Sequence, residues 1–296
     1  MEQGRLQRWF DIKGWTALLI GTPYVWLLVW FLLPFLIVLA MSVATNTPTA
    51  PPFSFGGAHP WINWEPFSRV LTDGLYLRAF LTSIFNAFVA MVFCLLIGYP
   101  MALGLTRVSR SWRNILLMLV ILPFWTSFLL RVYALSGFLR GEGVINNTLA
   151  VFGLGPFTMM QTDFAVYVGI VYSYLPFFIL PLYTNLVKLD PSLLEASADL
   201  GARPIRTFFS ITLPLSMPGV IAGSMLVFIP AIGEFVIPSL LGGPGTQMIG
   251  RILWDEFFSK TNWPRAAALA ISMLVVVVIP MMLMQRAQNA VVEGRR

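Results

Sequence analysis

The acid Glu234 directly follows a long apolar run and is the ionisable side chain best placed for binding chemistry. A carboxylate at the centre of a membrane costs up to about 2.5–3.5 kcal/mol, and less toward the interface, so an acid in such a position is a functional candidate. The faces of aromatic rings add cation–π contacts worth about 0.5–2 kcal/mol each. Together these groups could bind ammonium groups. We therefore expect a substrate path that includes Glu234, Trp125, Tyr133, Tyr172 and Tyr174, with Asp163 attracting cations at its outer mouth.

Each of these residues also has a plainer interpretation. Aromatic side chains in membrane helices are more often packing or interfacial residues than ligand contacts. Glu234 could form an internal salt bridge, for which Arg131 is the nearest candidate by expected depth. Asp163, Asp255 and Glu256 could be ordinary solvated loop acids. The two interpretations differ in whether these side chains face a path, or instead face the protein interior and bulk water.

The chain lacks the residues that nucleotide, metal or hydrolytic chemistry requires. A P-loop has the pattern Gly-x4-Gly-Lys-Ser/Thr, and none of the lysines, Lys13, Lys188 and Lys260, follows a glycine. With one histidine, His59, and one cysteine, Cys94, the chain cannot form a catalytic histidine set, an intrachain disulfide or a cysteine-rich metal site. We expect no enzyme activity, no cofactor and no metal site in this chain, and we interpret the histidine as an ordinary loop residue.

Composition indicates a membrane protein. Of 296 residues, 57% are apolar, 14% are aromatic and only 11% are charged, whereas soluble domains carry about 25% charged residues. So few charges cannot cover a water-facing surface, which excludes a soluble enzyme, and so many apolar residues exclude a disordered chain. The sequence therefore predicts an all-α integral membrane protein.

Six stretches free of Asp, Glu, Lys and Arg are long enough to cross a hydrocarbon core of roughly 30 Å as helices. Because the first is too long for a signal-peptide core, we expect it to be retained as an anchor. The loops give no sign of two inverted three-helix halves, which argues against a self-contained secondary transporter. The predicted spans are residues 16–43, 79–106, 114–130, 164–187, 207–233 and 266–285.

The basic residues predict how these spans are oriented. Twelve of the 19 Lys and Arg residues fall at the two termini, in the second-to-third loop and in the fourth-to-fifth loop, and seven fall in the other three loops. The positive-inside rule then places both termini in the cytoplasm. Residues 44–78 become the first periplasmic loop, and residues 188–215 become a cytoplasmic loop. The net charge of +6 reflects this orientation, and no nucleic-acid partner is expected.

The fourth-to-fifth loop carries the signals of a short helix–turn–helix. Asp190 can cap a helix that begins at Pro191, and Gly201 can end it in the left-handed conformation. Pro204 can begin a second short helix that Pro214 stops. On these grounds alone, the loop is either a re-entrant cap or a docking element for another protein.

The spacing within this loop resembles the signature of binding-protein-dependent ABC importer permeases. That signature is Glu-Ala-Ala, three residues, Gly, nine residues and Ile-x-Leu-Pro; at the same spacings the chain has Glu195-Ala196-Ser197, Gly201 and Ile211-x-Leu213-Pro214. Serine replaces the second alanine. The resemblance implies a type I ABC importer permease fold, with residues 1–296 forming a single transmembrane permease domain, and a coupling helix that sits in a cleft of a cytoplasmic ATPase. The coupling residues implied are Asp190, Leu193, Glu195, Ala196, Ser197, Gly201, Ile211, Leu213 and Pro214.

Two further runs, residues 222–244 and 248–258, resemble those of putrescine/spermidine importer permeases. The Gly-Glu-Phe triplet at 233–235 also occurs in related oxyanion permeases, so the longer run carries the assignment. The resemblance implies a permease subunit of the bacterial inner membrane that forms half of a path for polyamines. The alternatives are a permease for another organic cation, an amino-acid derivative or an oxyanion, or else an autonomous channel or proton-coupled carrier.

The same resemblance implies the partners of this chain. They are a second homologous permease subunit, two ATPase subunits, a periplasmic substrate-binding protein and membrane lipid. ATP and Mg would bind in the partner ATPase, so ATP hydrolysis would reside in a separate subunit.

Overall fold

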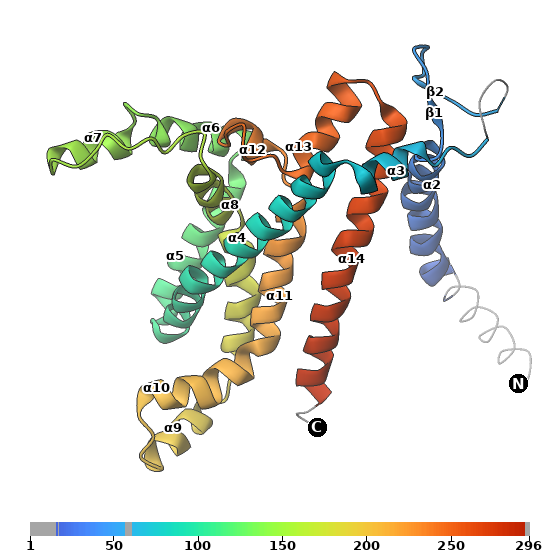
Figure 1. Ribbon diagram of the computed structural model, residues 1–296. Coiled ribbons are helices and arrows are strands. Elements are labelled where there is room, and N and C mark those ends of the chain that lie inside the picture. Colours follow the sequence, from blue (N-terminus) through green and yellow to red (C-terminus); the bar gives the residue numbers. More distant parts are fainter. Residues whose placement is uncertain (1–15, 17, 57–60, 294–296) are drawn as a thin grey trace, which may run out of the picture. The chain divides into compact units, whose positions relative to one another are not determined.

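In the computed structural model, the described residues are 16, 18–56 and 61–293. His59 and most of the terminal basic residues used to predict orientation lie outside them. The chain divides into two compact units: unit 1 comprises Met1–Leu71 and Glu256–Ile271, and unit 2 comprises Thr72–Asp255 and Ser272–Arg296. Apart from one two-stranded sheet, the described elements are helices (Figure 1), as the composition predicts.

Five of the six predicted spans are confirmed, and the other corresponds to a bent helix pair. Five described helices are long and apolar enough to cross a membrane, and each overlaps a predicted span. The remaining candidate is a helix pair, Arg110–Trp125 and Phe128–Val151, which is bent by 97°. The five long helices are Leu18–Met41, Gly74–Arg107, Asp163–Leu186, Pro204–Ile232 and Trp263–Arg286.

Unit 2 is built on α4 (Gly74–Arg107), α8 (Asp163–Leu186) and α11 (Leu213–Ile232), which pack against one another. In Figure 1, α9 and α10 lie at one end of α8 and α11, whereas α12 and α13 lie at the opposite end. The shorter elements are α5 (Arg110–Ile121), η2 (Leu122–Trp125), α6 (Phe128–Leu139), α7 (Val144–Val151), α9 (Pro191–Asp199), α10 (Pro204–Thr207), η3 (Phe208–Thr212), α12 (Val236–Leu240) and α13 (Ile249–Trp254).

The predicted third span, residues 114–130, contains a break. Pro123 in the 3-10 turn η2 has no N–H with which to continue a helical ladder. Thr126 then adopts an extended backbone, and both its N–H and its hydroxyl donate to the carbonyl oxygen of Pro123, at 3.2 and 2.8 Å. A count of uncharged residues cannot detect this break, because Thr126 and Ser127 carry no charge.

Close packing in unit 2 depends on glycines that face Phe178 of α8. A Cβ added to Gly98 of α4 would lie 2.6 Å from Cδ1 of Phe178, and one added to Gly223 of α11 would lie 2.8 Å from its carbonyl oxygen. The hydroxyls of Tyr99 and Ser216 also lie 2.8 Å apart and join α4 to α11. These three helices thus form a tightly packed frame for the residues at their ends.

The described part of unit 1 combines an apolar helix with a small polar assembly. The helix Leu18–Met41 includes η1 (Leu28–Leu32) and α2 (Leu33–Met41), and none of its most apolar stretch is buried. The strands pair antiparallel, with Thr45 opposite Ser54. The other elements are β1 (Thr45–Asn46), β2 (Phe53–Ser54), α3 (Glu65–Thr72), η4 (Asp255–Ser259) and the beginning of α14 (Trp263–Glu293).

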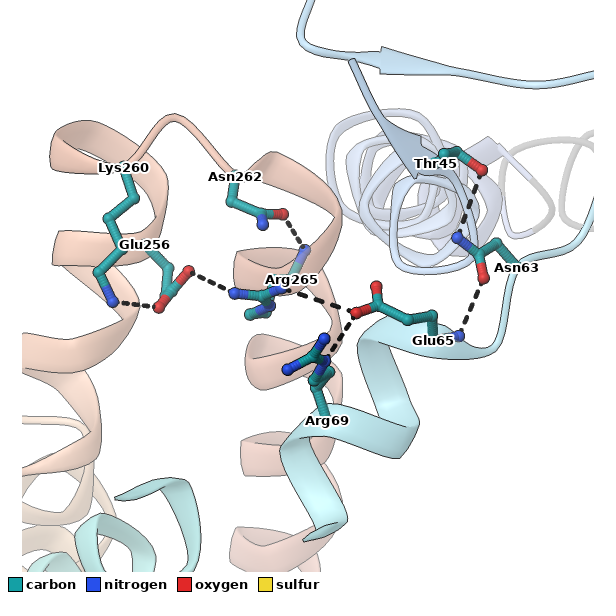
Figure 2. A network of polar contacts seen from close by, with 8 residues as sticks. All are labelled: Thr45, Asn63, Glu65, Arg69, Glu256, Lys260, Asn262 and Arg265. Carbon is teal, nitrogen blue, oxygen red and sulfur yellow. Dashed lines mark hydrogen bonds and ion pairs between the residues drawn. The ribbon is translucent and has the colours of Figure 1, made fainter. Parts of the chain in front are cut away.

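Glu256 in unit 1 is not a solvated loop acid, so that interpretation was wrong. Its side chain is fully buried, because two cations compensate its charge. Oε1 of Glu256 accepts a hydrogen bond from Nζ of Lys260 at 2.6 Å, and Oε2 lies 3.8 Å from Nη1 of Arg265. Arg265 also lies 3.7 Å from Glu65, which pairs with Arg69 at 2.9 Å (Figure 2). The network joins α3, η4 and the start of α14.

Candidate functional site

Both carboxylate oxygens of Glu234 accept hydrogen bonds from the protein. The residue follows the end of α11 and is only 6% exposed. Oε1 accepts from the backbone N–H groups of Phe235, Val236 and Ile237 at 3.1, 3.0 and 3.3 Å, which are donors that the start of a helix leaves unpaired. Oε2 accepts from the hydroxyl of Tyr174 in α8 at 2.5 Å. These donors stabilise a charge that burial would otherwise disfavour.

Arg131 does not pair with Glu234, so the salt bridge suggested by their expected depths was wrong. Among the described residues, no ion pair joins the two. The guanidinium instead lies against the rings of Phe124 and Phe128, 5.6 and 5.7 Å from their centroids. Backbone N–H groups and the hydroxyl of Tyr174, and not the arginine, donate the hydrogen bonds that stabilise the carboxylate.

The four aromatic residues predicted for the substrate path differ in their surroundings. Of the four, Tyr174 contacts Glu234. Trp125, Tyr133 and Tyr172 are 83%, 54% and 42% exposed. No ring contact among the described residues joins any two of the four. The exposed rings face surroundings outside this chain, and their place in a substrate path stays a prediction.

The segment after α11 is fastened to the ends of α4 and α8. The N–H of Ile249 donates to Oγ of Ser83 in α4 at 2.7 Å. The hydroxyl of Thr246 donates to the carboxylate of Asp163, the first residue of α8. Asp163 is exposed, so its carboxylate both holds this segment and remains accessible to water.

The predicted helix between Asp190 and Gly201 is confirmed as α9. Oδ1 of Asp190 accepts a hydrogen bond from the N–H of Ser192 at 3.0 Å, and this bond lowers the pKa of the Asp190 carboxyl below its ordinary value. Gly201 adopts a φ of +74°, the left-handed conformation expected at a helix end. Local sequence signals are therefore enough to define both ends of this helix.

Pro214 does not stop the second helix of the loop, contrary to the prediction. The chain runs as one long helix over Pro204–Ile232. The π-helix Phe208–Thr212 widens the turn just before Pro214, which then occupies the first turn of α11, where its missing N–H is tolerated. Pro214 is exposed, while Ile211 and Leu213 are half-buried. The loop therefore continues directly into the fifth span.

The α9 helix has an outer and an inner side. Leu193, Glu195 and Ala196 are exposed and are available to a partner. Ser197 is 7% exposed, and its Oγ lies 2.8 Å from Oγ1 of Thr207 in α10. The serine at this motif position thus braces the two arms of the loop and does not contribute to the outer surface.

Comparison with known protein families shows which family the chain belongs to. The family of binding-protein-dependent transport system inner membrane components matches residues 94–293. The chain belongs to this family. It is a multi-pass inner-membrane permease, a translocation component and not an enzyme. The matched region includes α8, the loop that carries α9, and Glu234.

Similarity to named relatives extends over most of the permease. It is 40% identical over 272 residues to the spermidine/putrescine transport system permease protein PotB of Haemophilus influenzae, covering 91% of this chain and 93% of that protein. It is 38% identical over 273 residues to PotB of Escherichia coli, covering 92% and 97%. A chain of a bacterial ABC transporter involved in the import of the acidic polysaccharide alginate has a TM-score of 0.74 at 17% identity, covering 96% of this chain and 98% of that chain. The permease therefore has the type I ABC importer permease fold.

Several polar contacts of the permease were not expected from its sequence. Tyr174 pairs with Glu234, Tyr99 pairs with Ser216, and Ser83 receives the backbone N–H of the residue that begins α13. Isolated hydroxyls in long apolar helices are a signal for such contacts. Their partners are 60, 117 and 166 residues away, so spacing along the chain could not identify them.

Proposed function

We propose that this permease forms half of the translocation path of an ATP-driven importer for polyamines such as putrescine and spermidine. The observation that carries the proposal is the 40% identity to a spermidine/putrescine permease over 91% of this chain and 93% of that protein. Similarity over nearly the whole length includes the membrane helices and the loops between them. It therefore supports a shared substrate class better than the short loop motif does.

The surroundings of Glu234 support a cationic substrate. A protonated amine that enters a narrow path loses hydration water, and a carboxylate replaces it through charge and hydrogen bonding. Oε1 already accepts three backbone hydrogen bonds, so the contact falls to Oε2, which Tyr174 positions. In this proposal the exposed Trp125, Tyr133 and Tyr172, together with Asp163, complete the path alongside a second, homologous permease.

The energy for transport would come from partner subunits. Two ATPase subunits, which bind ATP and Mg, would receive the exposed side of α9, and a periplasmic binding protein would deliver the polyamine. Closure of the ATPases would pull on residues 188–215. Because the chain is one continuous helix over Pro204–Ile232, the pull would pass along this helix to the fifth span.

Uptake of radiolabelled spermidine by cells with and without this permease tests the substrate assignment. We expect loss of the permease to abolish this uptake. We also expect unlabelled putrescine or spermidine to inhibit uptake of the labelled spermidine, whereas an unrelated organic cation or molybdate should not inhibit it. Undiminished uptake without the permease, or competition by molybdate alone, would contradict the assignment.

A further inference from the structure

A cavity of about 470 Å³ lies in unit 2, where the loop that carries α9 meets the ends of α4 and α8. The α4 helix ends at Arg107 and α8 ends at Leu186. Both helices span the membrane, so the cavity opens at the depth of the lipid headgroups. Leu103, Leu194 and Phe208 form an apolar wall on one part of it.

The polar side of this cavity is positively charged. Arg107 and Arg113 line it, and none of its lining residues, all of which lie in the described part of the chain, is acidic. The guanidinium of Arg113 is fixed by hydrogen bonds of 3.2–3.3 Å to the carbonyl oxygens of Leu105, Thr106 and Val108. Arg107 is exposed and makes no ion pair among the described residues. The cavity thus combines a fixed guanidinium with an unpaired one.

We propose that this cavity binds the phosphate of an anionic phospholipid headgroup. Guanidinium groups bind phosphate through charge-assisted hydrogen bonds, and basic pockets between membrane helices at headgroup depth suit anionic lipids. The apolar wall decides between a lipid and a soluble phosphate compound. It can cover the upper part of an acyl chain, whereas a soluble anion would leave that wall in water.

A lipid in this position would contact the coupling loop from its inner side. Pro191, Ala202 and Thr207 also line the cavity, and Thr207 is the residue that holds Ser197. A bound headgroup would therefore restrain α9 relative to the end of α4. The lipid composition of the membrane would then regulate how ATPase closure reaches the fifth span. This regulatory consequence rests on the proposed function, but the proposal of a lipid-binding site does not rest on it.

Lipid retention by the complete importer complex tests the site. The complex, purified in detergent, would be incubated with equal amounts of phosphatidylglycerol and phosphatidylcholine, and the retained lipid measured by native mass spectrometry. Arg110→Gln is the matched control, because Arg110 begins α5 nearby, is exposed and does not line the cavity. We expect the unmodified complex and this control to prefer phosphatidylglycerol. Arg107→Gln should weaken that binding about fivefold, the contribution of one basic residue near an anionic headgroup.

A second variant makes the result independent of the charge change. Ala202→Leu fills the cavity without altering charge and should also reduce phosphatidylglycerol retention. If the Arg107→Gln complex does not assemble, Ala202→Leu alone tests whether the cavity binds the lipid. Equal retention by the unmodified complex and both cavity variants would overturn the proposal. Displacement of phosphatidylglycerol by inorganic phosphate at constant ionic strength would assign the cavity to a soluble phosphate compound and would overturn the lipid assignment.

Discussion

The hydroxyl of Tyr174 in α8 donates a 2.5 Å hydrogen bond to Oε2 of Glu234, which lies 60 residues further along the chain. This contact joins the fourth and fifth spans at the carboxylate proposed to meet the substrate. The other oxygen, Oε1, accepts the backbone N–H groups that begin α12. Oε1 thus accepts only from backbone donors, whereas Oε2 accepts a single side-chain hydroxyl that also supports the fold, so substitutions at Glu234 and Tyr174 test the charge and this bond separately.

Glu234→Gln should lower polyamine uptake while leaving the complex assembled. Glutamine keeps the size of the side chain and an oxygen that can accept the backbone N–H groups, but it removes the charge. Hydrogen bonds to charged groups contribute about 1.5–3 kcal/mol, so we expect uptake at low substrate concentration to fall about tenfold or more. Uptake and ATPase rates of purified complexes measure this. Adding Arg131→Gln should not restore uptake, because the two residues do not pair; restoration would favour a structural salt bridge.

Tyr174→Phe should destabilise the permease, whereas Tyr172→Phe should not. The first substitution removes the donor to a buried carboxylate oxygen, which costs about 1–3 kcal/mol. Tyr172 is 42% exposed, and its hydroxyl makes no hydrogen bond among the described residues, so its loss should be nearly neutral. Thermal melting of the two purified variants is the comparison. Equal melting temperatures would show that the bond to Glu234 adds nothing to stability.

Gly201→Val should uncouple ATP hydrolysis from uptake. Gly201 has a φ of +74° and open space around the position of a Cβ, so the substitution is disfavoured by backbone conformation and not by a clash. Gly201→Asn is the matched control, because asparagine tolerates the left-handed region. The ratio of uptake to ATP hydrolysed in reconstituted complexes should fall for valine and persist for asparagine. Full coupling in the valine variant would contradict the assigned role of α9.

Glu195→Arg should also uncouple transport, through the surface of α9 and not its backbone. Glu195 is exposed, so its replacement leaves the helix intact while presenting the wrong charge and a longer side chain to the ATPase. We expect the purified complex to lose bound ATPase subunits or their stimulation by the loaded binding protein. If the Glu195→Arg complex still coupled ATP hydrolysis to uptake normally, the ATPase would have to dock somewhere other than on this side of the helix.

The orientation of the spans can be tested by labelling single cysteines. The only native cysteine, Cys94, is fully buried in unit 2 and can be replaced by serine to give a clean background. A membrane-impermeant thiol reagent applied from the periplasm should label cysteines introduced at Trp61 and Glu142 but not at Arg110. Periplasmic labelling at position 110 would reverse the orientation predicted from the basic residues.

Local signals account for the parts of the structure that the sequence predicted well. Asp190, Pro191 and Gly201 act within one or two turns of the chain, so the ends of α9 follow from their residue types alone. The long apolar runs likewise predict five spans, because burial in a membrane depends mainly on length and composition. Features of this kind do not require knowledge of which helices are neighbours.

The remaining features depend on burial, backbone geometry or contacts that residue types alone do not report. Lys260 lies only four residues after Glu256, but the sequence does not show that Arg265 at the start of the next helix would also approach the carboxylate and that the side chain of Glu256 would be buried. Pro214 looked like a helix stop because a π-turn that accommodates it has no clear sequence pattern. The pairing of Glu234 with Tyr174, and not with Arg131, follows from the packing of α8 against α11.

ATP-dependent uptake by proteoliposomes tests the central claim most directly. The vesicles would contain this permease, its partner permease and the ATPase subunits, with the binding protein outside and ATP inside. We predict uptake of labelled spermidine that requires both ATP and the binding protein and is inhibited by putrescine. Spermidine uptake that persists without the ATPase subunits, or a complex that takes up molybdate and excludes spermidine, would contradict the account.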